Sequence, residues 1–287
     1  MTGAPPEDGP RGAPRPVVLV RPAAGEERPI VVEVPHAGVG VPEEVRGEIA
    51  LDEAALLRDA DLFVDRLYRE APARGATLLY SEVSRVVVDL NRDEADVDGR
   101  VVSGHPAPRA DSPRGVIWRL ATDGQEAQRA ALPYPAYLRR IERWYRPYHA
   151  ALDGEVARLL GRFGRVVVLS GHSMPSRGGA AHDEPGRRRA DVVPGDLEGR
   201  ACAPWLTRAA LDHFYRAGLS VAANDPYKGG NTTRRLGRPE AGVDALQIEL
   251  NRDLYMDEAT FAIRPEGFAR MASLCLDLVE ILGTRRG

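Results

Sequence analysis

Residues 166–173 read Val-Val-Val-Leu-Ser-Gly-His-Ser. The four consecutive apolar residues of this stretch predict a strand buried on both faces, as in the parallel sheets of α/β proteins. Further apolar runs predict strands at 17–20, 30–34, 77–80, 85–90, 219–222 and 244–250. Apolar residues at helical spacing predict helices at 61–74, 134–163 with a kink before Pro147, 203–217 and 265–282. Interleaved strands and helices predict a three-layer α/β/α sandwich with a mixed central sheet.

The bulk composition is that of an ordinary globular protein. The chain has 287 residues, which is enough for one large domain with a sizeable core. A net charge of -3 favours neither nucleic acid nor an anionic membrane as a partner. Its two cysteines, Cys202 and Cys275, form no disulfide or zinc motif, and a cytoplasmic location is expected.

The sequence divides into a short N-terminal tail and one predicted domain. Residues 1–15 are rich in proline, glycine and charge, which predicts a disordered tail without a secretory signal. No run approaches the roughly 20 apolar residues that a membrane helix needs. Residues 16–287 contain no repeat and no linker, so a single domain with long loops is predicted.

Two histidines follow two of the predicted strands directly. His36 comes after the strand at 30–34, and His172 comes after the strand at 166–169. Ligands of open α/β sheets bind beyond the carboxyl ends of the strands, so the two imidazoles could share one metal ion. Catalytic zinc sites commonly use three protein ligands and leave a position for water. The alternative is that each histidine only satisfies loop backbone.

The third metal ligand is open on the residues alone. Asp61 lies, with Asp59, at the predicted start of a helix, where aspartate is also favoured as a cap. Glu43 and Glu44 follow His36 and compete for the same role, although both fit a solvated helix start.

A carboxylate also interrupts the predicted strand at 244–250. One face carries Leu246, Ile248 and Leu250, and the other carries Gln247, Glu249 and Asn251. A carboxylate in a covered strand is costly unless it is paired or functional. Glu249 is therefore a candidate general base toward a water activated by metal, and an edge strand with one wet face is the alternative.

Arginines near these segments favour an anionic substrate. Arg92 lies just beyond the predicted strand at 85–90, and arginine holds a carboxylate through two parallel hydrogen bonds. For Asp89 in that strand, a structural pair with an arginine is the preferred interpretation. The segment 224–235 is rich in glycine and hydroxyls and includes Arg234, so it could wrap a small acid or form a plain surface loop. His149, on the apolar side of the helix at 134–163, is interpreted as a core histidine or a neighbour of the ligands.

Across roughly residues 30–260 the chain resembles the N-formylglutamate amidohydrolase family, also called N-formylglutamate deformylases. The matching segments are Pro-His-Ala-Gly at 35–38, Asp-Ala-Asp-Leu-Phe at 59–63, Ser-Arg-Val-Val-Val-Asp-Leu-Asn-Arg at 84–92, Gly-His-Ser-Met-Pro-Ser at 171–176, Tyr-Lys-Gly-Gly at 227–230, Thr-Arg at 233–234 and Gln-Ile-Glu-Leu-Asn-Arg at 247–252. No single motif is decisive, but their order along the chain is specific.

The resemblance implies a fold similar to zinc carboxypeptidases and aminoacylases. It implies hydrolysis of N-formyl-L-glutamate to formate and L-glutamate, as in histidine degradation, with Zn²⁺ or another divalent metal. It assigns His36, His172 and Asp61 to the metal and Glu249 to the general base. The substrate carboxylates fall to Arg92, Arg234 and Arg85, with Asn91 beside them.

One position departs from the family. Many members have an acidic residue two positions before the second histidine, where this chain has Ser170. An acid there would orient the imidazole from outside the ligand set, so the departure bears on metal affinity and substrate. Two alternatives follow: a deacylase of another N-acyl amino acid, and a non-catalytic small-acid binding protein on the same fold.

Overall fold

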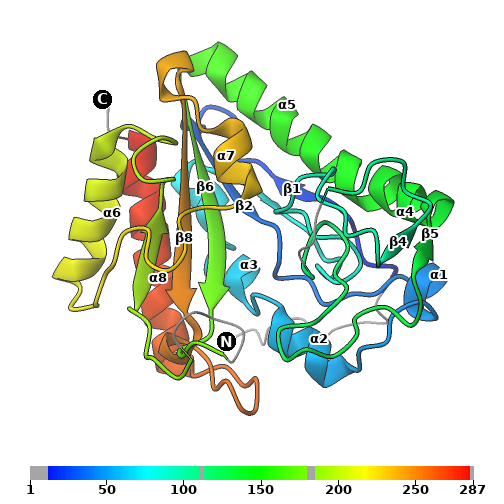
Figure 1. Cartoon of the computed structure of the whole chain (residues 1–287). Helices are drawn as coiled ribbons and strands as arrows, with labels where there is room; N and C mark the ends of the chain where they lie inside the picture. Colours follow the sequence, from blue (N-terminus) through cyan, green and yellow to red (C-terminus); the bar gives the residue numbers. More distant parts are fainter. Residues whose placement is uncertain (1–11, 110–112, 180–184, 285–287) are drawn as a thin grey trace.

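A six-stranded mixed sheet forms the middle layer of the computed structural model, which describes residues 12–109, 113–179 and 185–284 (Figure 1). The order across the sheet is β1 (Val18–Val20), β3 (Thr77–Tyr80), β2 (Ile30–Val34), β6 (Val166–Met174), β8 (Val243–Asn251) and β7 (Val192–Gly195). The four inner strands are parallel, and β1 and β7 pair antiparallel with their neighbours. The mixed sheet predicted from the sequence is confirmed.

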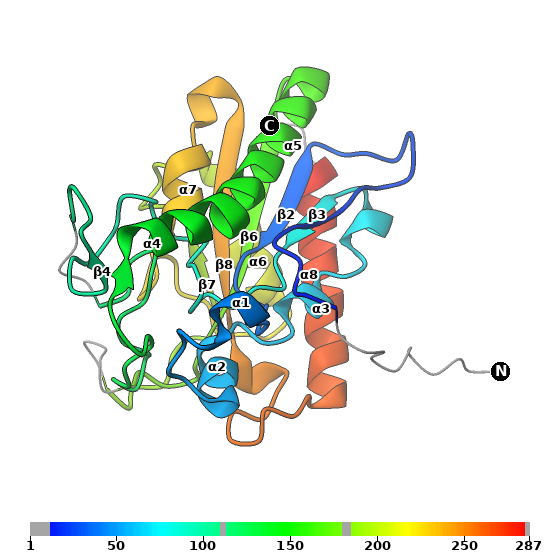
Figure 2. The same cartoon turned by 90° about the vertical axis from the view of Figure 1, so that its right-hand side faces the viewer.

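Helices cover both faces of this sheet (Figures 1 and 2). On one side lie α3 (Val64–Leu67), α6 (Pro204–Arg216) and α8 (Pro265–Thr284), and on the other lie α4 (Tyr134–Arg140), the π-helical turn η2 (Ile141–Tyr145) and α5 (Arg146–Phe163). Each side has its own buried hydrophobic cluster. The α/β/α layering is therefore confirmed as well.

The remaining elements are short. They are α1 (Glu43–Arg46), α2 (Glu53–Asp59), η1 (Ala71–Arg74), β4 (Val102–Ser103), β5 (Leu132–Pro133), α7 (Asn231–Leu236), η3 (Pro239–Ala241) and η4 (Arg252–Leu254). Strands β4 and β5 pair with each other and form a separate two-stranded sheet. None of the helices in the described ranges is both long and apolar enough to cross a membrane.

The sheet face toward α5 changes from apolar to polar along the strands. Alternate residues of a strand share a face, so the register places side chains in rows across β2, β6 and β8. The first row is Val31, Val168 and Ala245, the second is Glu33, Ser170 and Gln247, and the third contains His172 and Glu249. The opposite face stays apolar, with Val32, Leu169 and Leu246 in one cluster. Polar side chains therefore concentrate at the carboxyl ends of the strands, mainly on the face toward α5.

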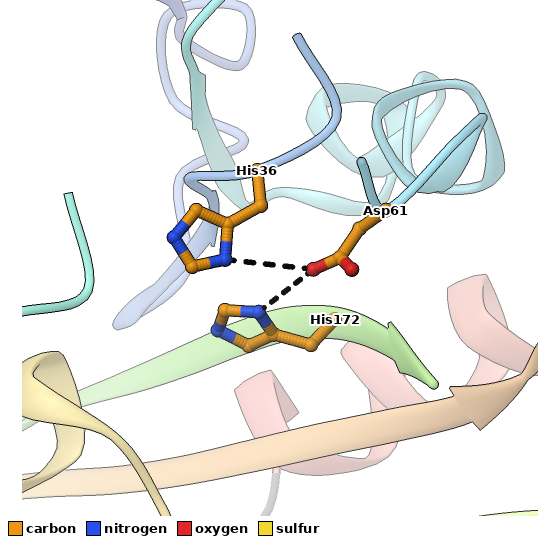
Figure 3. Close-up of side chains that lie close together, drawn as sticks. All are labelled: His36, Asp61 and His172. Atoms are coloured by element: carbon orange, nitrogen blue, oxygen red, sulfur yellow. Dashed lines mark hydrogen bonds and ion pairs between the residues drawn. The ribbon is translucent and has the colours of Figure 1, made fainter. Parts of the chain in front are cut away.

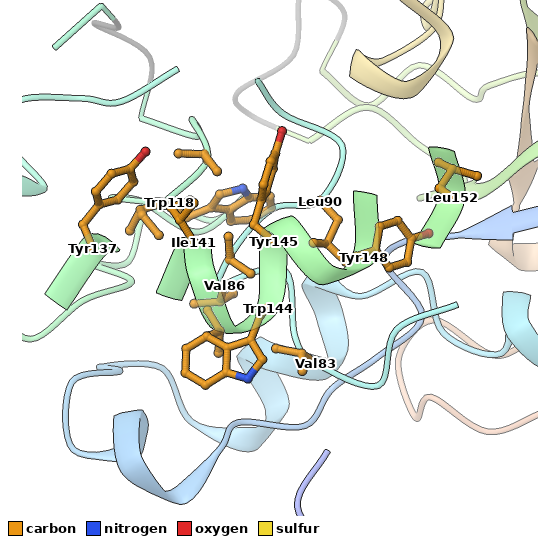
Figure 4. Packing of buried hydrophobic residues seen from close by; sticks show 14 of the residues in the cluster. Val83, Val86, Leu90, Trp118, Tyr137, Ile141, Trp144, Tyr145, Tyr148 and Leu152 are labelled. Atoms are coloured by element: carbon orange, nitrogen blue, oxygen red, sulfur yellow. The ribbon is translucent and has the colours of Figure 1, made fainter. Parts of the chain in front are cut away.

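The long helix predicted at 134–163 is present, with a change of hydrogen bonding where the kink is expected. α4 passes into the π-helical turn, and α5 then begins one residue before Pro147. Proline lacks the backbone N–H of a helical bond and crowds the preceding turn, which a π-type bulge relieves. The helix packs its aromatic side chains on the segment 83–90, as Figure 4 shows for Trp144 and Tyr148.

The strand predicted at 85–90 is wrong. The segment forms turns, in which Val87 N–H donates to Ser84 O at 2.9 Å and Asp89 N–H donates to Val116 O at 2.8 Å. Val86, Val87 and Val88 are all buried, so no face alternates. Burial under α4 and α5 outweighs the β-propensity of the valines. The strand predicted at 219–222 is reduced to one isolated bridge between Val221 and Val192.

The helix predicted at 61–74 is also wrong in its extent. α2 ends at Asp59, and Asp61 lies in the link before the single turn of α3. Phe63 has a φ of 67°, a left-handed conformation that a right-handed helix cannot include. The side chain that caps α2 is Asp52, which accepts from Ala55 N–H at 2.8 Å. Asp61 is thus free of the capping role that its position in the sequence allowed.

The proposed division of the chain at residue 16 stays a prediction. Residues 1–11 of the predicted tail lie outside the described residues. At the boundary, Arg15 donates its backbone N–H to a carboxylate oxygen of Glu82 at 2.9 Å, and its guanidinium pairs with the same residue.

Candidate metal centre

Three side chains from distant parts of the sequence converge at the carboxyl end of the sheet (Figure 3). His36 follows β2, His172 lies in β6, and Asp61 comes from the link between α2 and α3. One ligand atom from each lies within 4.8 Å of the other two, and the imidazole centroids are 5.0 Å apart. All three residues are buried. A single cation can therefore contact all three.

The competing carboxylates lie elsewhere. Glu43 and Glu44 are exposed on α1, and Glu44 pairs with Arg143 at 2.8 Å. Neither belongs to the group that His36 and His172 form with Asp61.

Backbone contacts fix the two strand-end segments against each other. β2 and β6 are adjacent and parallel, so their ends meet at one edge of the sheet. Asp61 donates its backbone N–H to His36 O at 2.9 Å. Gly38 allows the chain after His36 to lie on Glu82, because a Cβ at residue 38 would stand 2.3 Å from the carbonyl carbon of Glu82.

The orientation of each imidazole leaves its Nδ1 atom toward Asp61. His36 Nε2 lies 2.7 Å from Asp89 Oδ1, and His172 Nε2 lies 3.0 Å from Ser170 Oγ. The two Nδ1 atoms lie 3.6 Å and 3.0 Å from Asp61 Oδ2. His36 Nδ1 is buried without a hydrogen-bond partner in the described part of the chain. Two imidazole nitrogens and a carboxylate oxygen form a donor set that fits zinc, with the far nitrogens held by outer groups.

Arg252 holds the other oxygen of Asp61. Its Nη2 lies 3.2 Å from Asp61 Oδ1, and its remaining nitrogens donate to Ser173 Oγ at 3.0 Å and Arg58 O at 2.7 Å. Burial opposes ionisation of Asp61, but the hydrogen bond from His172, the nearby His36 ring and the charge of Arg85 outweigh it and hold the pKa well below its usual range. Asp61 is therefore a charged carboxylate with one oxygen aimed at the histidines.

Asp89 supports His36 and is itself surrounded by donors. It accepts from Trp118 Nε1 at 2.8 Å and from Asn91 N–H at 2.9 Å, and Arg85 Nη2 lies 3.1 Å away. Burial tends to raise the pKa of Asp89, but the charges of His36 and Arg85 have the larger effect. Together they hold this pKa well below the usual range. The structural pair of Asp89 with an arginine is present, and the same carboxylate also orients His36.

Glu249 lies directly beside His172 in the sheet. The register pairs these two residues across β6 and β8. The Glu249 side chain accepts from Gln247 Nε2 at 2.8 Å and is only 6% exposed. Burial raises the pKa of Glu249; His172 opposes the rise, and the charge of Asp61 adds to it. The edge-strand alternative does not apply, because β8 is paired on both sides.

The four predicted substrate residues lie in different surroundings. Arg85 is already paired with Asp89 and stacks on Trp118, with its guanidinium carbon 4.8 Å from the ring centroid. Arg92 is half-buried, and its guanidinium has no hydrogen bond or ion pair within the described ranges. Asn91 Nδ2 lies 3.2 Å from His172 Nε2, and its Oδ1 accepts from Thr232 N–H at 3.0 Å.

Arg234 lines a separate cavity of about 410 Å³. The lining residues are Asp93, Glu94, Tyr145, His149, Asn231, Arg234 and Arg235, and none of the candidate ligands is among them. Burial, with the charge of Arg235, lowers the pKa of His149 to about 3. His149 is therefore a buried, neutral histidine on the wall of this cavity.

Sequence reasoning missed two residues of this centre. Arg252 forms an ion pair with Asp61, and Glu33 lies on β2 directly beside Ser170 of the adjacent strand β6. The signal for Glu33 was present, because a carboxylate stands inside an otherwise apolar strand, as Glu249 does. Arg252 gave no comparable signal, since its contact with Asp61 joins residues far apart in the chain.

Comparisons with known proteins agree on one family. The family model described as N-formylglutamate amidohydrolase matches residues 28–256. An N-formylglutamate deformylase of Pseudomonas putida is 32% identical over 234 residues, which are 80% of this chain and 82% of the relative. Another of Pseudomonas aeruginosa is 33% identical over 260 residues, or 88% and 92%. A crystal structure of N-formylglutamate amidohydrolase from Ralstonia eutropha JMP134 superposes with a TM-score of 0.85 at 35% identity, covering 94% of this chain and 97% of that one.

Proposed function

This chain belongs to the N-formylglutamate amidohydrolase family, and we propose that it hydrolyses N-formyl-L-glutamate to formate and L-glutamate in histidine degradation. The names of its relatives support the substrate. The observation that carries the chemistry is the buried group of His36, Asp61 and His172, with Glu249 beside it in the sheet.

A divalent cation held by those three side chains would supply a Lewis acid for the formyl oxygen and a water molecule with a pKa near 7. Zinc is the proposed metal, because the donors are two imidazoles and one carboxylate. Asp89 and Arg252 keep the donors in place from outside the ligand set.

Glu249 serves as the general base. Its carboxylate takes a proton from the attacking water while the new C–O bond forms at the formyl carbon. It then returns that proton to the amine nitrogen as the C–N bond breaks. Burial raises the pKa of Glu249 toward the working pH, which suits a group that both accepts and donates a proton.

Arg92 binds a substrate carboxylate. Its half-buried guanidinium has no partner within the described ranges, and its neighbour Asn91 contacts His172. Charge-assisted, two-pronged hydrogen bonds from arginine both attract and orient a carboxylate. N-formylglutamate carries two such groups, so a single arginine accounts for one of them.

The test is formate release by the purified protein. N-formyl-L-glutamate should give the highest kcat/KM in a panel with N-formyl-L-glutamine, N-formyl-L-aspartate and N-acetyl-L-glutamate. A chelator should abolish turnover, and added Zn²⁺ should restore it. The His172→Ala variant should be inactive, whereas the control His213→Ala, on α6, should match the parent. Stoichiometric metal without hydrolysis of any panel member would contradict the proposal.

A further inference from the structure

Glu33 is a buried carboxyl group to which the proposed reaction assigns no role. It lies in the middle of β2 with no exposed surface. Tyr148 donates its hydroxyl to Glu33 Oε2 at 2.5 Å, and Ser170 donates its hydroxyl to Oε1. No arginine, lysine or histidine forms an ion pair with Glu33 in the part of the chain that the structure describes. A buried carboxylate held only by hydroxyls is costly unless a positive charge nearby compensates it.

Ser170 connects Glu33 to His172. Its Oγ lies 3.0 Å from His172 Nε2, and the register of β2 and β6 places Ser170 directly opposite Glu33. If His172 offers Nδ1 to a cation, its Nε2 carries the proton and needs an acceptor. The Asn91 amide nitrogen also lies 3.2 Å from Nε2, but it is a donor, because Asn91 Oδ1 already accepts from Thr232. It cannot accept that proton, and in this tautomer the amide no longer donates to Nε2. The Ser170 hydroxyl is thus the acceptor from Nε2, and it donates its own hydrogen bond to Glu33.

We propose that Glu33 is the positioning residue of His172 and acts through the hydroxyl of Ser170. This inference rests on the metal centre proposed above. Each histidine would then have its Nε2 atom held by a carboxylate. Asp89 contacts His36 Nε2 directly, and Glu33 is linked to His172 Nε2 through the Ser170 hydroxyl. The acid that residue 170 lacks is supplied by the neighbouring strand. The charge of the bound cation, relayed through His172, compensates the buried carboxylate.

Metal affinity is the direct readout of this role. The Zn²⁺ dissociation constant is measured by competition with a chromophoric chelator, and Co²⁺ spectra report the ligand geometry. Glu33→Gln and Ser170→Ala should each weaken Zn²⁺ binding about 10–100-fold, as loss of outer groups around a metal ligand does. The double variant Glu33→Ser with Ser170→Asp moves the acid onto residue 170, and it should recover affinity to within a few-fold of the parent.

Glu155→Gln is the matched control. Glu155 lies on α5, as Tyr148 does, and it is also a buried carboxylate, but it is paired with Arg21 and Arg158. This substitution should leave Zn²⁺ affinity unchanged. A purely structural role for Glu33 predicts loss of stability in the metal-free protein with unchanged affinity, and that result would overturn the proposal. Failure of the double variant to bind better than Ser170→Ala would also overturn it. These measurements need no substrate, so absence of formylglutamate hydrolysis would contradict only the proposed function.

Discussion

The orientations of the His36 and His172 rings make the candidate centre suitable for binding a cation. Each ring uses Nε2 for a protein partner, so that both Nδ1 atoms face Asp61. A histidine that only satisfied loop backbone would not leave a buried nitrogen such as His36 Nδ1 without a partner. The unused hydrogen-bonding capacity of His36 is therefore best explained by a ligand.

Glu249→Gln tests the general base at this scale. The amide keeps the size of the side chain but cannot accept a proton, so kcat should fall by about 10²–10⁴-fold. Zn²⁺ content should remain that of the parent, because Glu249 is outside the ligand group. Asp244→Asn, on the same strand, is the control and should retain full kcat. Parent-like turnover by Glu249→Gln would exclude Glu249 as the base.

Arg92→Ala tests substrate recognition. Loss of a charge-assisted hydrogen bond typically costs about 1.5–3 kcal/mol, so kcat/KM should fall about 10–100-fold, mainly through a higher KM. Arg139→Ala, an exposed arginine on α4, should behave as the parent does. Steady-state kinetics on both variants would refute the assignment if their KM values were equal.

Two inner strands and the long helices were predictable, and the segments around the centre were not. Apolar runs gave β2 and β3 with the boundaries that the structure has, and they placed His36 directly after β2. The strand predicted at 166–169 is longer than expected, because β6 extends to Met174 and includes His172. The segment 85–90 looked like a strand because valine favours strands, but it is buried in turns under α5. Tertiary packing of this kind joins distant residues and has no local signal.

The candidate site was predictable to the same extent. His36, His172 and Glu249 stand out because polar residues interrupt or end apolar strands. The preference for Asp61 over Glu43 and Glu44 came from the family resemblance, since the local pattern indicated a helix cap. The link to Glu33 depends on strand register, which one sequence does not reveal.

His149, which lies on α5, should make the stability of the fold depend on pH in acid. Burial lowers the pKa of His149 to about 3, whereas the unfolded value is about 6.5. Between these values the unfolded chain binds a proton that the native chain does not, so stability falls as the pH is lowered from 6.5 toward 3. The loss of unfolding free energy that His149 causes approaches about 1.4 kcal/mol per pH unit.

Urea unfolding at pH 6.5 and 4.5, with chelator to remove metal linkage, measures this effect. His149→Gln should lose about 2 kcal/mol less between the two pH values than the parent does. His213→Gln, at a partly buried site on α6, should show the parental dependence. Identical slopes for His149→Gln and the parent would contradict a neutral buried His149.

At the scale of the whole molecule, the centre joins segments from across the chain. It draws on β2, β6 and the link after α2, so a cation bound there would connect residues 36, 61 and 172. A ligand that binds only the native state stabilises it by mass action, by about 2.7 kcal/mol at a hundredfold excess over Kd. The centre should therefore contribute to global stability as well as to catalysis.

Calorimetry of the metal-loaded and chelated protein tests this coupling. For a chain of this size, removal of the metal should lower Tm by about 4–5 °C at that excess. The His172→Ala variant should show no such difference, and His213→Ala should show the full difference. Equal Tm values for loaded and chelated parent protein would mean that the cation does not bind the native fold.

Anomalous diffraction from crystals grown with Zn²⁺ would locate the cation that His36, Asp61 and His172 are proposed to share. We expect one peak about 2.0–2.2 Å from His36 Nδ1, His172 Nδ1 and an Asp61 carboxylate oxygen. The two Nε2 atoms should still face Asp89 and Ser170. A zinc peak bound through the Nε2 atoms, or no peak between these three residues, would rule out this metal centre.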